Sequence, residues 1–148
     1  MIEINKVYNI DCIDLMKEMI KQNLKADTLL TDIPYGAVNA RSNGRDRYEG
    51  QLRKIKKDYA DTMTFDMQEY LELTDKCIKG NFIIFCGTEQ ISQIRDFYDL
   101  KGYTTRLLIW EKTNPSPMNG QYVYLSGIEC CVWAKKPNVT FNARGETL

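Results

Sequence analysis

The chain has 148 residues, of which 43% are hydrophobic and 11% aromatic, a composition typical of one globular domain spanning residues 1–148. Its 20 Lys and Arg side chains balance its 20 Asp and Glu side chains, which disfavours a protein that coats nucleic acid through net charge alone. The absence of histidine excludes imidazole catalysis within the chain, and the cysteines lack the spacing of a disulfide framework or a zinc site, so we expect no metal and buried free thiols at Cys12, Cys77, Cys86, Cys130 and Cys131.

The first part of the chain predicts a strand, a helix and a second strand. Residues 6–10 are predicted to form a short strand. Apolar side chains then recur at helical spacing over residues 12–21, and Asp11 is placed to cap the N-terminus of that helix. Residues 26–31 are predicted to form a buried strand that ends in the tetrapeptide Asp32-Ile33-Pro34-Tyr35.

Residues 36–64 differ in kind and are predicted to form a flexible basic loop. Long segments of this type inside compact domains are usually lids, binding loops or disordered stretches. A solvated charged segment and a loop that contacts phosphates carry equal weight. The candidate phosphate contacts are Arg41, Arg45, Arg47, Lys54, Lys56 and Lys57.

A second helix and a central strand follow this loop. The helix is predicted over residues 66–79, with Gly80 as its C-cap. The uninterrupted apolar run at residues 81–86 predicts a central parallel strand covered on both faces.

The last part of the chain predicts one helix and two strands. The helix covers residues 89–100 and is stopped by Gly102. Strands are expected at residues 104–111 and 129–134, on either side of a rigid proline-containing loop at residues 114–120. The alternation predicts an α/β fold with a mostly parallel sheet and a final antiparallel strand.

The tetrapeptide combines two hydrogen-bond acceptors with an aromatic platform. Asp32 supplies a carboxylate, and Ile33 is held extended by the following proline, so its carbonyl is expected to point outward. Pro34 fixes its own φ, and Tyr35 offers a flat face for stacking. These features suit an exocyclic amine on a planar ring. Four residues alone favour a simple β-turn, but open α/β sheets bind ligands at strand ends of this kind.

With its surroundings, the tetrapeptide resembles the catalytic motif of the amino-methylating DNA methyltransferases, usually Asp-Pro-Pro-Tyr. In the subgroup whose catalytic half comes first, three further segments are similar and stand in the same order. They are Tyr8-Asn9-Ile10-Asp11-Cys12, Leu108-Ile109-Trp110-Glu111-Lys112-Thr113-Asn114-Pro115 and Ser126-Gly127-Ile128-Glu129-Cys130-Cys131-Val132-Trp133. The resemblance extends over residues 8–136 and implies a partial Rossmann-like fold of the S-adenosylmethionine-dependent methyltransferases.

Two positions depart from the family pattern. The first proline of the usual motif is Ile33 here, which still offers a carbonyl but with less rigidity. The family binds S-adenosylmethionine with a glycine-rich turn after a strand, typically Phe-x-Gly-x-Gly, and this sequence does not contain it. The chain is therefore expected to be the catalytic half of an enzyme, without the main cofactor-binding turn.

The resemblance also implies roles for individual residues. The Asp32 carboxylate and the Ile33 carbonyl accept the two N–H bonds of the amine on a flipped base, and Pro34 and Tyr35 complete the motif. The amine lone pair is thereby directed at the methyl group of the cofactor.

Several weaker assignments accompany these. Asp11 is most simply a helix cap, although related enzymes place this turn near the cofactor. Asn114 and Pro115 belong to a loop that lies beside the flipped base in the family, or to simple turn chemistry. Trp110 and Trp133 are expected in the core.

The expected function is methylation of double-stranded DNA at adenine N6, with cytosine N4 as the alternative. A second hypothesis is an inactive DNA-binding remnant without a cofactor site, and a protein or RNA amide methyltransferase is a third. An exposed sheet edge at residues 26–31 is expected to favour self-association. With no visible signal peptide and no apolar run long enough to cross a bilayer, we expect a cytoplasmic protein.

Overall fold

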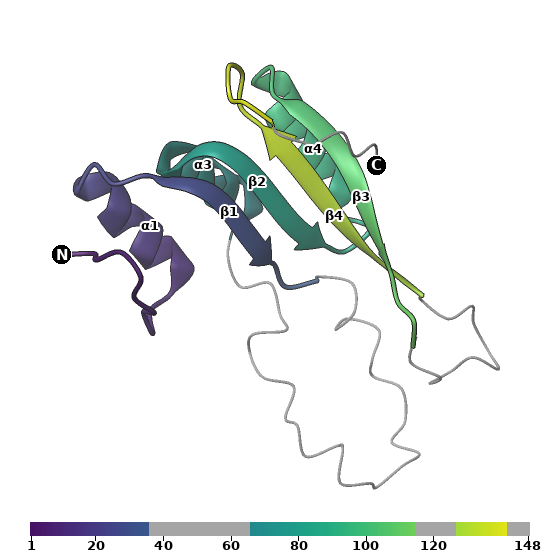
Figure 1. Ribbon diagram of the computed structural model, residues 1–148, viewed down its shortest axis with the longest axis horizontal. Helices are drawn as coiled ribbons and strands as arrows, with labels where there is room; N and C mark the ends of the chain where they lie inside the picture. Colours follow the sequence, from purple (N-terminus) through teal and green to yellow (C-terminus); the bar gives the residue numbers. More distant parts are fainter. Residues whose placement is uncertain (36–65, 115–126, 142–148) are drawn as a thin grey trace, which may run out of the picture.

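The computed structural model describes residues 1–35, 66–114 and 127–141. In chain order, the elements are α1 (Cys12–Lys21), β1 (Ala26–Asp32), α3 (Met67–Cys77), β2 (Ile78–Cys86), α4 (Ile91–Leu100), β3 (Thr104–Glu111) and β4 (Ile128–Lys135). Within the described residues, the strands form one four-stranded sheet that is packed against the helices (Figure 1). The predicted α/β fold class is thereby confirmed.

The strands lie in the order β1-β2-β4-β3. β1 and β2 pair in parallel, whereas β4 is antiparallel to both of its neighbours. β1, β2 and β3 therefore run in one direction, and their C-terminal ends share one edge of the sheet. The final antiparallel strand, predicted from the sequence, is inserted between β2 and β3 and not added at the outside.

Helix ends follow the sequence signals closely. The Asp11 carboxylate accepts a hydrogen bond of 2.8 Å from the Ile13 N–H and caps α1. Asp66 caps α3 in the same way, with bonds of 2.7 and 3.1 Å from the Gln68 and Glu69 N–H groups. Gly102 follows α4 with φ of 75°, the left-handed conformation that favours glycine after a helix. No helix in the described part of the chain is long and apolar enough to cross a membrane.

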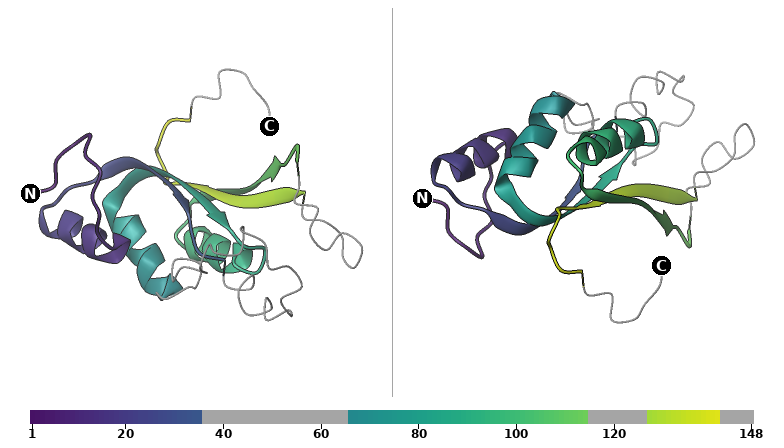
Figure 2. Two further views of the ribbon diagram at one scale, coloured as in Figure 1. Left: turned by 90° about the horizontal axis from the view of Figure 1, so that it is seen from below. Right: turned by 90° about the horizontal axis from the view of Figure 1, so that it is seen from above.

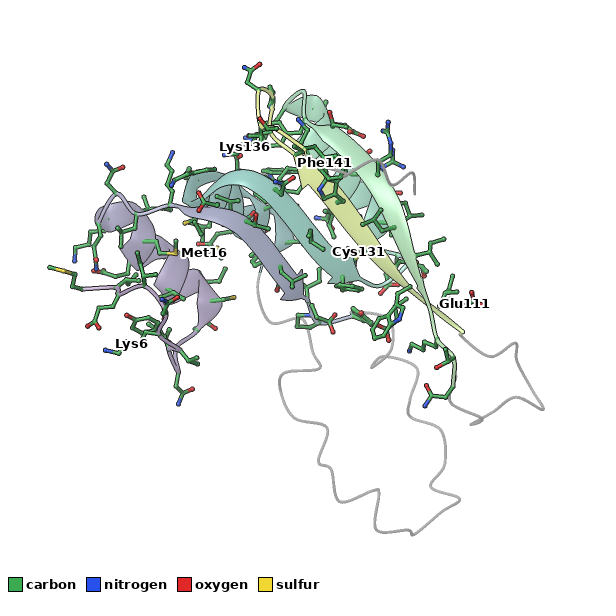
Figure 3. All side chains as sticks on the ribbon, viewed as in Figure 1. Lys6, Met16, Glu111, Cys131, Lys136 and Phe141 are labelled. Atoms are coloured by element: carbon green, nitrogen blue, oxygen red, sulfur yellow. The ribbon has the colours of Figure 1, made fainter. Side chains whose placement is uncertain are left out.

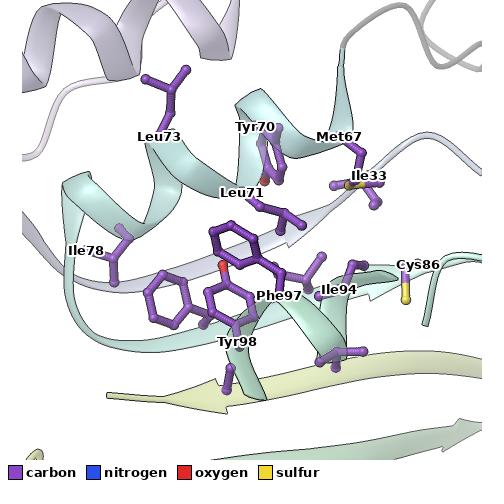
Figure 4. Close-up of a cluster of buried hydrophobic side chains, with 14 of the residues drawn as sticks. Ile33, Met67, Tyr70, Leu71, Leu73, Ile78, Cys86, Ile94, Phe97 and Tyr98 are labelled. Atoms are coloured by element: carbon purple, nitrogen blue, oxygen red, sulfur yellow. The ribbon is translucent and has the colours of Figure 1, made fainter. Parts of the chain in front are cut away.

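All three described helices lie on one face of the sheet (Figure 2). The core lies between that face and the helices (Figure 4). Its fully buried side chains include Leu71, Phe82, Ile84 and Ile94. Phe82 of β2 packs on Tyr98 of α4, with ring centroids 4.6 Å apart. The opposite face of the sheet carries no described helix.

One-sided packing corrects three expectations about burial. β2 is not covered on both faces, because Phe82 and Ile84 are buried under the helices while Ile83 and Phe85 are half-buried on the open face. β1 is not a buried strand, since Leu30 is 70% exposed. Trp110 is 58% exposed and is not part of the core. Trp133 is only half-buried.

Three further predictions were wrong: a strand at residues 6–10, a helix C-cap at Gly80 and a buried thiol at Cys12. Residues 6–10 form no strand and pair with none of the described strands. Lys6 lies on the N-terminal segment beside α1 (Figure 3). Gly80 is not a C-cap, because α3 passes directly into β2 at Ile78. A Cβ at Gly80 would lie 2.9 Å from the Asp27 carbonyl oxygen, so the glycine allows close strand approach. Cys12 is exposed, whereas the other four cysteines are buried and all five are free.

Candidate active site

The tetrapeptide lies at the C-terminal end of β1, as predicted. Asp32 is the last residue of β1 and pairs with Phe85 of β2, and its side chain is exposed. The Ile33 N–H donates a bond of 3.1 Å to the Phe85 carbonyl. The Ile33 side chain is buried in the same core cluster as Met67 of α3 (Figure 4). Because side chains alternate along a strand, the Asp32 carboxylate is directed to the open face when Ile33 is directed to the core.

Pro34 is held by a residue that the sequence analysis did not single out. The side-chain amide of Gln90 donates a bond of 2.9 Å to the Pro34 carbonyl and accepts one of 2.8 Å from the Gly87 N–H. Gln90 is only 5% exposed and immediately precedes α4. A glutamine before a helix is ordinary in sequence terms, so no local pattern indicated this contact.

Tyr35 follows with its hydroxyl directed inward. The hydroxyl oxygen is buried and has no hydrogen-bond partner among the described residues. Burial raises the pKa of Tyr35 far above its ordinary value, and the nearby Asp32 carboxylate, followed by the charge of Glu129, raises it further. The hydroxyl therefore stays protonated at neutral pH, close to Asp32.

An aromatic pair lies on the open face next to Asp32. Phe85, the cross-strand neighbour of Asp32, meets Trp110 of β3 edge to face, with ring centroids 6.3 Å apart and an interplanar angle of 75°. Cys131 of β4 lies between their strands in the sheet (Figure 3). Beyond the pair, the Lys112 ammonium and the Glu129 carboxylate form an ion pair of 2.5 Å. Planar rings and one exposed carboxylate thus occupy the same edge of the open face.

The weaker assignments divide into two groups. Asp11 is confirmed as a helix cap, and its neighbour Cys12 lines a hollow of about 350 Å³ together with Asp32 and Pro34. Asn114 is exposed beyond the end of β3, and β3 lies three strand positions from β1, which is about 14 Å at usual strand spacing. The structure thus brings the Asp11 turn toward the tetrapeptide but leaves Asn114 further along the edge. Outside the described residues lie Pro115 and the six basic residues Arg41, Arg45, Arg47, Lys54, Lys56 and Lys57.

Comparison with solved structures supports the fold independently. The chain is similar to M1.HpyAVI, a DNA methyltransferase, in its complex with S-adenosylmethionine, with a TM-score of 0.66 and 23% sequence identity. It is similar to M1.HpyAVI without the cofactor at a TM-score of 0.65 and the same 23% identity. The match covers 97% of this chain in each case, but only 62% and 63% of the M1.HpyAVI chains. No family model matches the sequence, and no curated protein matches it in sequence.

Proposed function

We propose that this chain carries the base-binding half of a methyltransferase site. Its substrate would be the exocyclic amine of a base flipped out of double-stranded DNA, adenine N6 in the first place, and its methyl donor S-adenosylmethionine. The observation that carries the proposal is the position of Asp32, an exposed carboxylate at the end of a strand, beside aromatic rings. The likeness in fold to M1.HpyAVI over nearly the whole chain supports it.

The chemistry follows from what these groups do to an amine. The amine lone pair of adenine is delocalised into the ring, so the nitrogen is a weak nucleophile. The Asp32 carboxylate would accept one N–H, and the Ile33 carbonyl would accept the other. These two hydrogen bonds draw the nitrogen toward pyramidal geometry and localise its lone pair. A hydrogen bond to a charged acceptor contributes about 1.5–3 kcal/mol. Stacking on Tyr35 adds roughly 1–3 kcal/mol. The hydrogen bond and the stacking together offset the few kcal/mol that it costs to extrude a base.

The described residues fit the base better than they fit the cofactor. S-adenosylmethionine, when bound, supplies an electrophilic methyl group. The hollow that joins Cys12 to Asp32 is walled mostly by apolar side chains of α1, β1 and α3. The sequence offers no glycine-rich turn after a strand. We therefore propose only the Asp11 turn as a cofactor contact.

Contacts to DNA are proposed from charge and position. Arg41, Arg45, Arg47, Lys54, Lys56 and Lys57 would contact phosphates, which lie close to a base extruded at β1. Asn114 and Pro115 would border the base from the side of β3. A cytoplasmic location is part of the same proposal.

Transfer of a labelled methyl group tests the proposal. The 148-residue protein is incubated with S-adenosylmethionine labelled in its methyl group and with unmethylated genomic DNA, and the digested nucleosides are resolved by mass spectrometry. We expect label in N6-methyladenine. Asp32→Asn should lower the rate by about 100-fold or more, the usual scale for a group that acts on the reacting atoms. Asp27→Asn is the matched control, because Asp27 lies on the same strand and, in the described part of the chain, its side chain forms only an exposed ion pair of 3.2 Å with Lys79. Equal activity of both variants would refute the assignment of Asp32.

The same digest decides between the alternatives. Label in N4-methylcytosine would identify cytosine as the target, because the acceptor geometry suits either amine. The second candidate function is a DNA-binding remnant without a cofactor site. Unlabelled nucleosides, combined with calorimetry that detects no S-adenosylmethionine binding, would support the remnant.

A further inference from the structure

Gln90 lies at the point where the β1–β2 ladder ends, and its side-chain amide contacts the main chain of Gly87 and of Pro34. The Gly87 N–H can only donate and the Pro34 carbonyl can only accept. The amide orientation is therefore fixed by its partners, with the oxygen at 2.8 Å from the Gly87 nitrogen and the nitrogen at 2.9 Å from the Pro34 oxygen. At 5% exposure, the side chain has little competition from water for either contact.

The Gly87 contact replaces the next bond of the ladder. In a parallel pair, a residue donates its N–H to one carbonyl of the neighbouring strand and accepts at its own C=O from the N–H two residues further along that strand. Ile33 donates to Phe85 at 3.1 Å, so its carbonyl would next accept from Gly87. The Gly87 N–H donates to Gln90 instead.

We propose that Gln90 is a positioning residue that ends this ladder one bond early and thereby keeps the Ile33 carbonyl open to the amine of the substrate base. Its other contact sets the orientation of the peptide that joins Pro34 to Tyr35. The proline ring fixes φ of Pro34, and the bond from Gln90 to the Pro34 carbonyl restrains ψ. Because a peptide unit is planar, this restraint also directs the start of Tyr35. The inference rests on the proposed function for the identity of the ligand, but its geometry is independent of that function.

Couplings across hydrogen bonds test the geometry directly. In the 148-residue protein labelled with ¹⁵N and ¹³C, the Gly87 nitrogen should show a through-hydrogen-bond coupling to the side-chain carboxamide carbon of Gln90. In Gln90→Leu, this coupling should move to the carbonyl carbon of Ile33, since the ladder can then continue. A coupling from Gly87 to Ile33 in the wild type, or its absence in the leucine variant, would overturn the inference.

Two further variants separate the parts of the proposal. Gln90→Glu keeps an acceptor for Gly87 but, when ionised, has no hydrogen to donate to Pro34, so the ladder should still end early. Gln93→Leu makes the same chemical change at an exposed position one turn further along α4 and should leave the Gly87 coupling unchanged. Loss of the coupling in Gln93→Leu would show that the signal reports general disturbance of α4, and would overturn the role of Gln90.

Amine recognition is measured separately by titration with 9-methyladenine and with 9-methylpurine, which lacks the amine. The wild type should prefer the adenine, and Gln90→Leu should reduce that preference by about 2- to 10-fold, the usual worth of one neutral hydrogen bond. An unchanged preference in Gln90→Leu would refute the link to the substrate. If the wild type shows no preference, the proposed function fails, while the couplings still decide whether Gln90 ends the ladder.

Discussion

Loss of the hydrogen bond between Thr74 and Tyr98 should cost more stability when Thr74 is replaced than when Tyr98 is replaced. The two hydroxyl oxygens lie 3.0 Å apart, and both residues are 0% exposed. The Thr74 hydroxyl also lies 2.8 Å from the Leu71 carbonyl, which can only accept, so the single Thr74 hydrogen is used there. Tyr98 must therefore donate to Thr74, and this bond ties α4 to α3.

The direction of donation sets the expected magnitudes. Thr74→Val keeps the side-chain volume but leaves the Tyr98 O–H buried without an acceptor, at a cost of about 1–3 kcal/mol. Tyr98→Phe removes the donor, while Thr74 keeps its bond to Leu71, so we expect a loss of about 1 kcal/mol or less. The double variant replaces both partners by apolar groups and should cost less than the sum of the two.

Urea unfolding of the four proteins, followed by circular dichroism, measures these differences in the free energy of unfolding. Thr74→Ser, which keeps the hydroxyl and removes only the methyl group, is the control for packing. If Tyr98→Phe proves as costly as Thr74→Val, or if the two effects simply add, then the assigned direction of donation is wrong.

Three other predictions follow from particular positions. Burial opposes ionisation of Asp75, but its hydrogen bonds hold its pKa below the ordinary value. The ionised carboxylate therefore stabilises the fold at pH values above its ordinary pKa. This contribution is lost as the pH falls through the lowered pKa. Urea midpoints should therefore fall less on acidification in Asp75→Asn than in the wild type, which retains the bonds from Tyr103, Lys101 and Lys136. Gly102→Ala should cost about 1–2 kcal/mol in the same assay, because φ is 75° while an added Cβ meets no atom within 4 Å, and Gly102→Asn should cost less. In the described residues β1 pairs only with β2, so light scattering should show association that rises with concentration and is reduced by Leu30→Lys, and a monomer throughout would contradict it.

Local signals in the sequence predicted the elements that depend on local physics. The helix at Cys12–Lys21 begins after Asp11 because the carboxylate of that residue satisfies an N–H of the first turn, which is visible in sequence. β3 was predicted with its observed bounds, Thr104–Glu111. Apolar spacing and caps are sufficient in such places.

Other features depend on partners that the sequence does not specify. Residues 6–10 have strand-like composition, yet Val7 is 98% exposed, because a strand requires a neighbouring edge. The apolar run in β2 predicts two covered faces, but the three described helices pack on one side only. The contact of Gln90 with Pro34 joins residues 56 positions apart, and only the folded sheet brings them together.

The departure at Ile33 changes how the tetrapeptide is made rigid. A proline at this position, as in the motif that the tetrapeptide resembles, fixes its own φ but has no N–H to donate. Ile33 instead donates to Phe85 and buries its side chain to 4% exposure, so the ladder and the core restrain it in place of a ring. A residue with an N–H can continue the ladder where a proline cannot. Its carbonyl is then well placed to accept the next ladder bond, from the Gly87 N–H. With isoleucine at this position, the proposed open carbonyl requires another acceptor for the Gly87 N–H, and the Gln90 side chain is that acceptor.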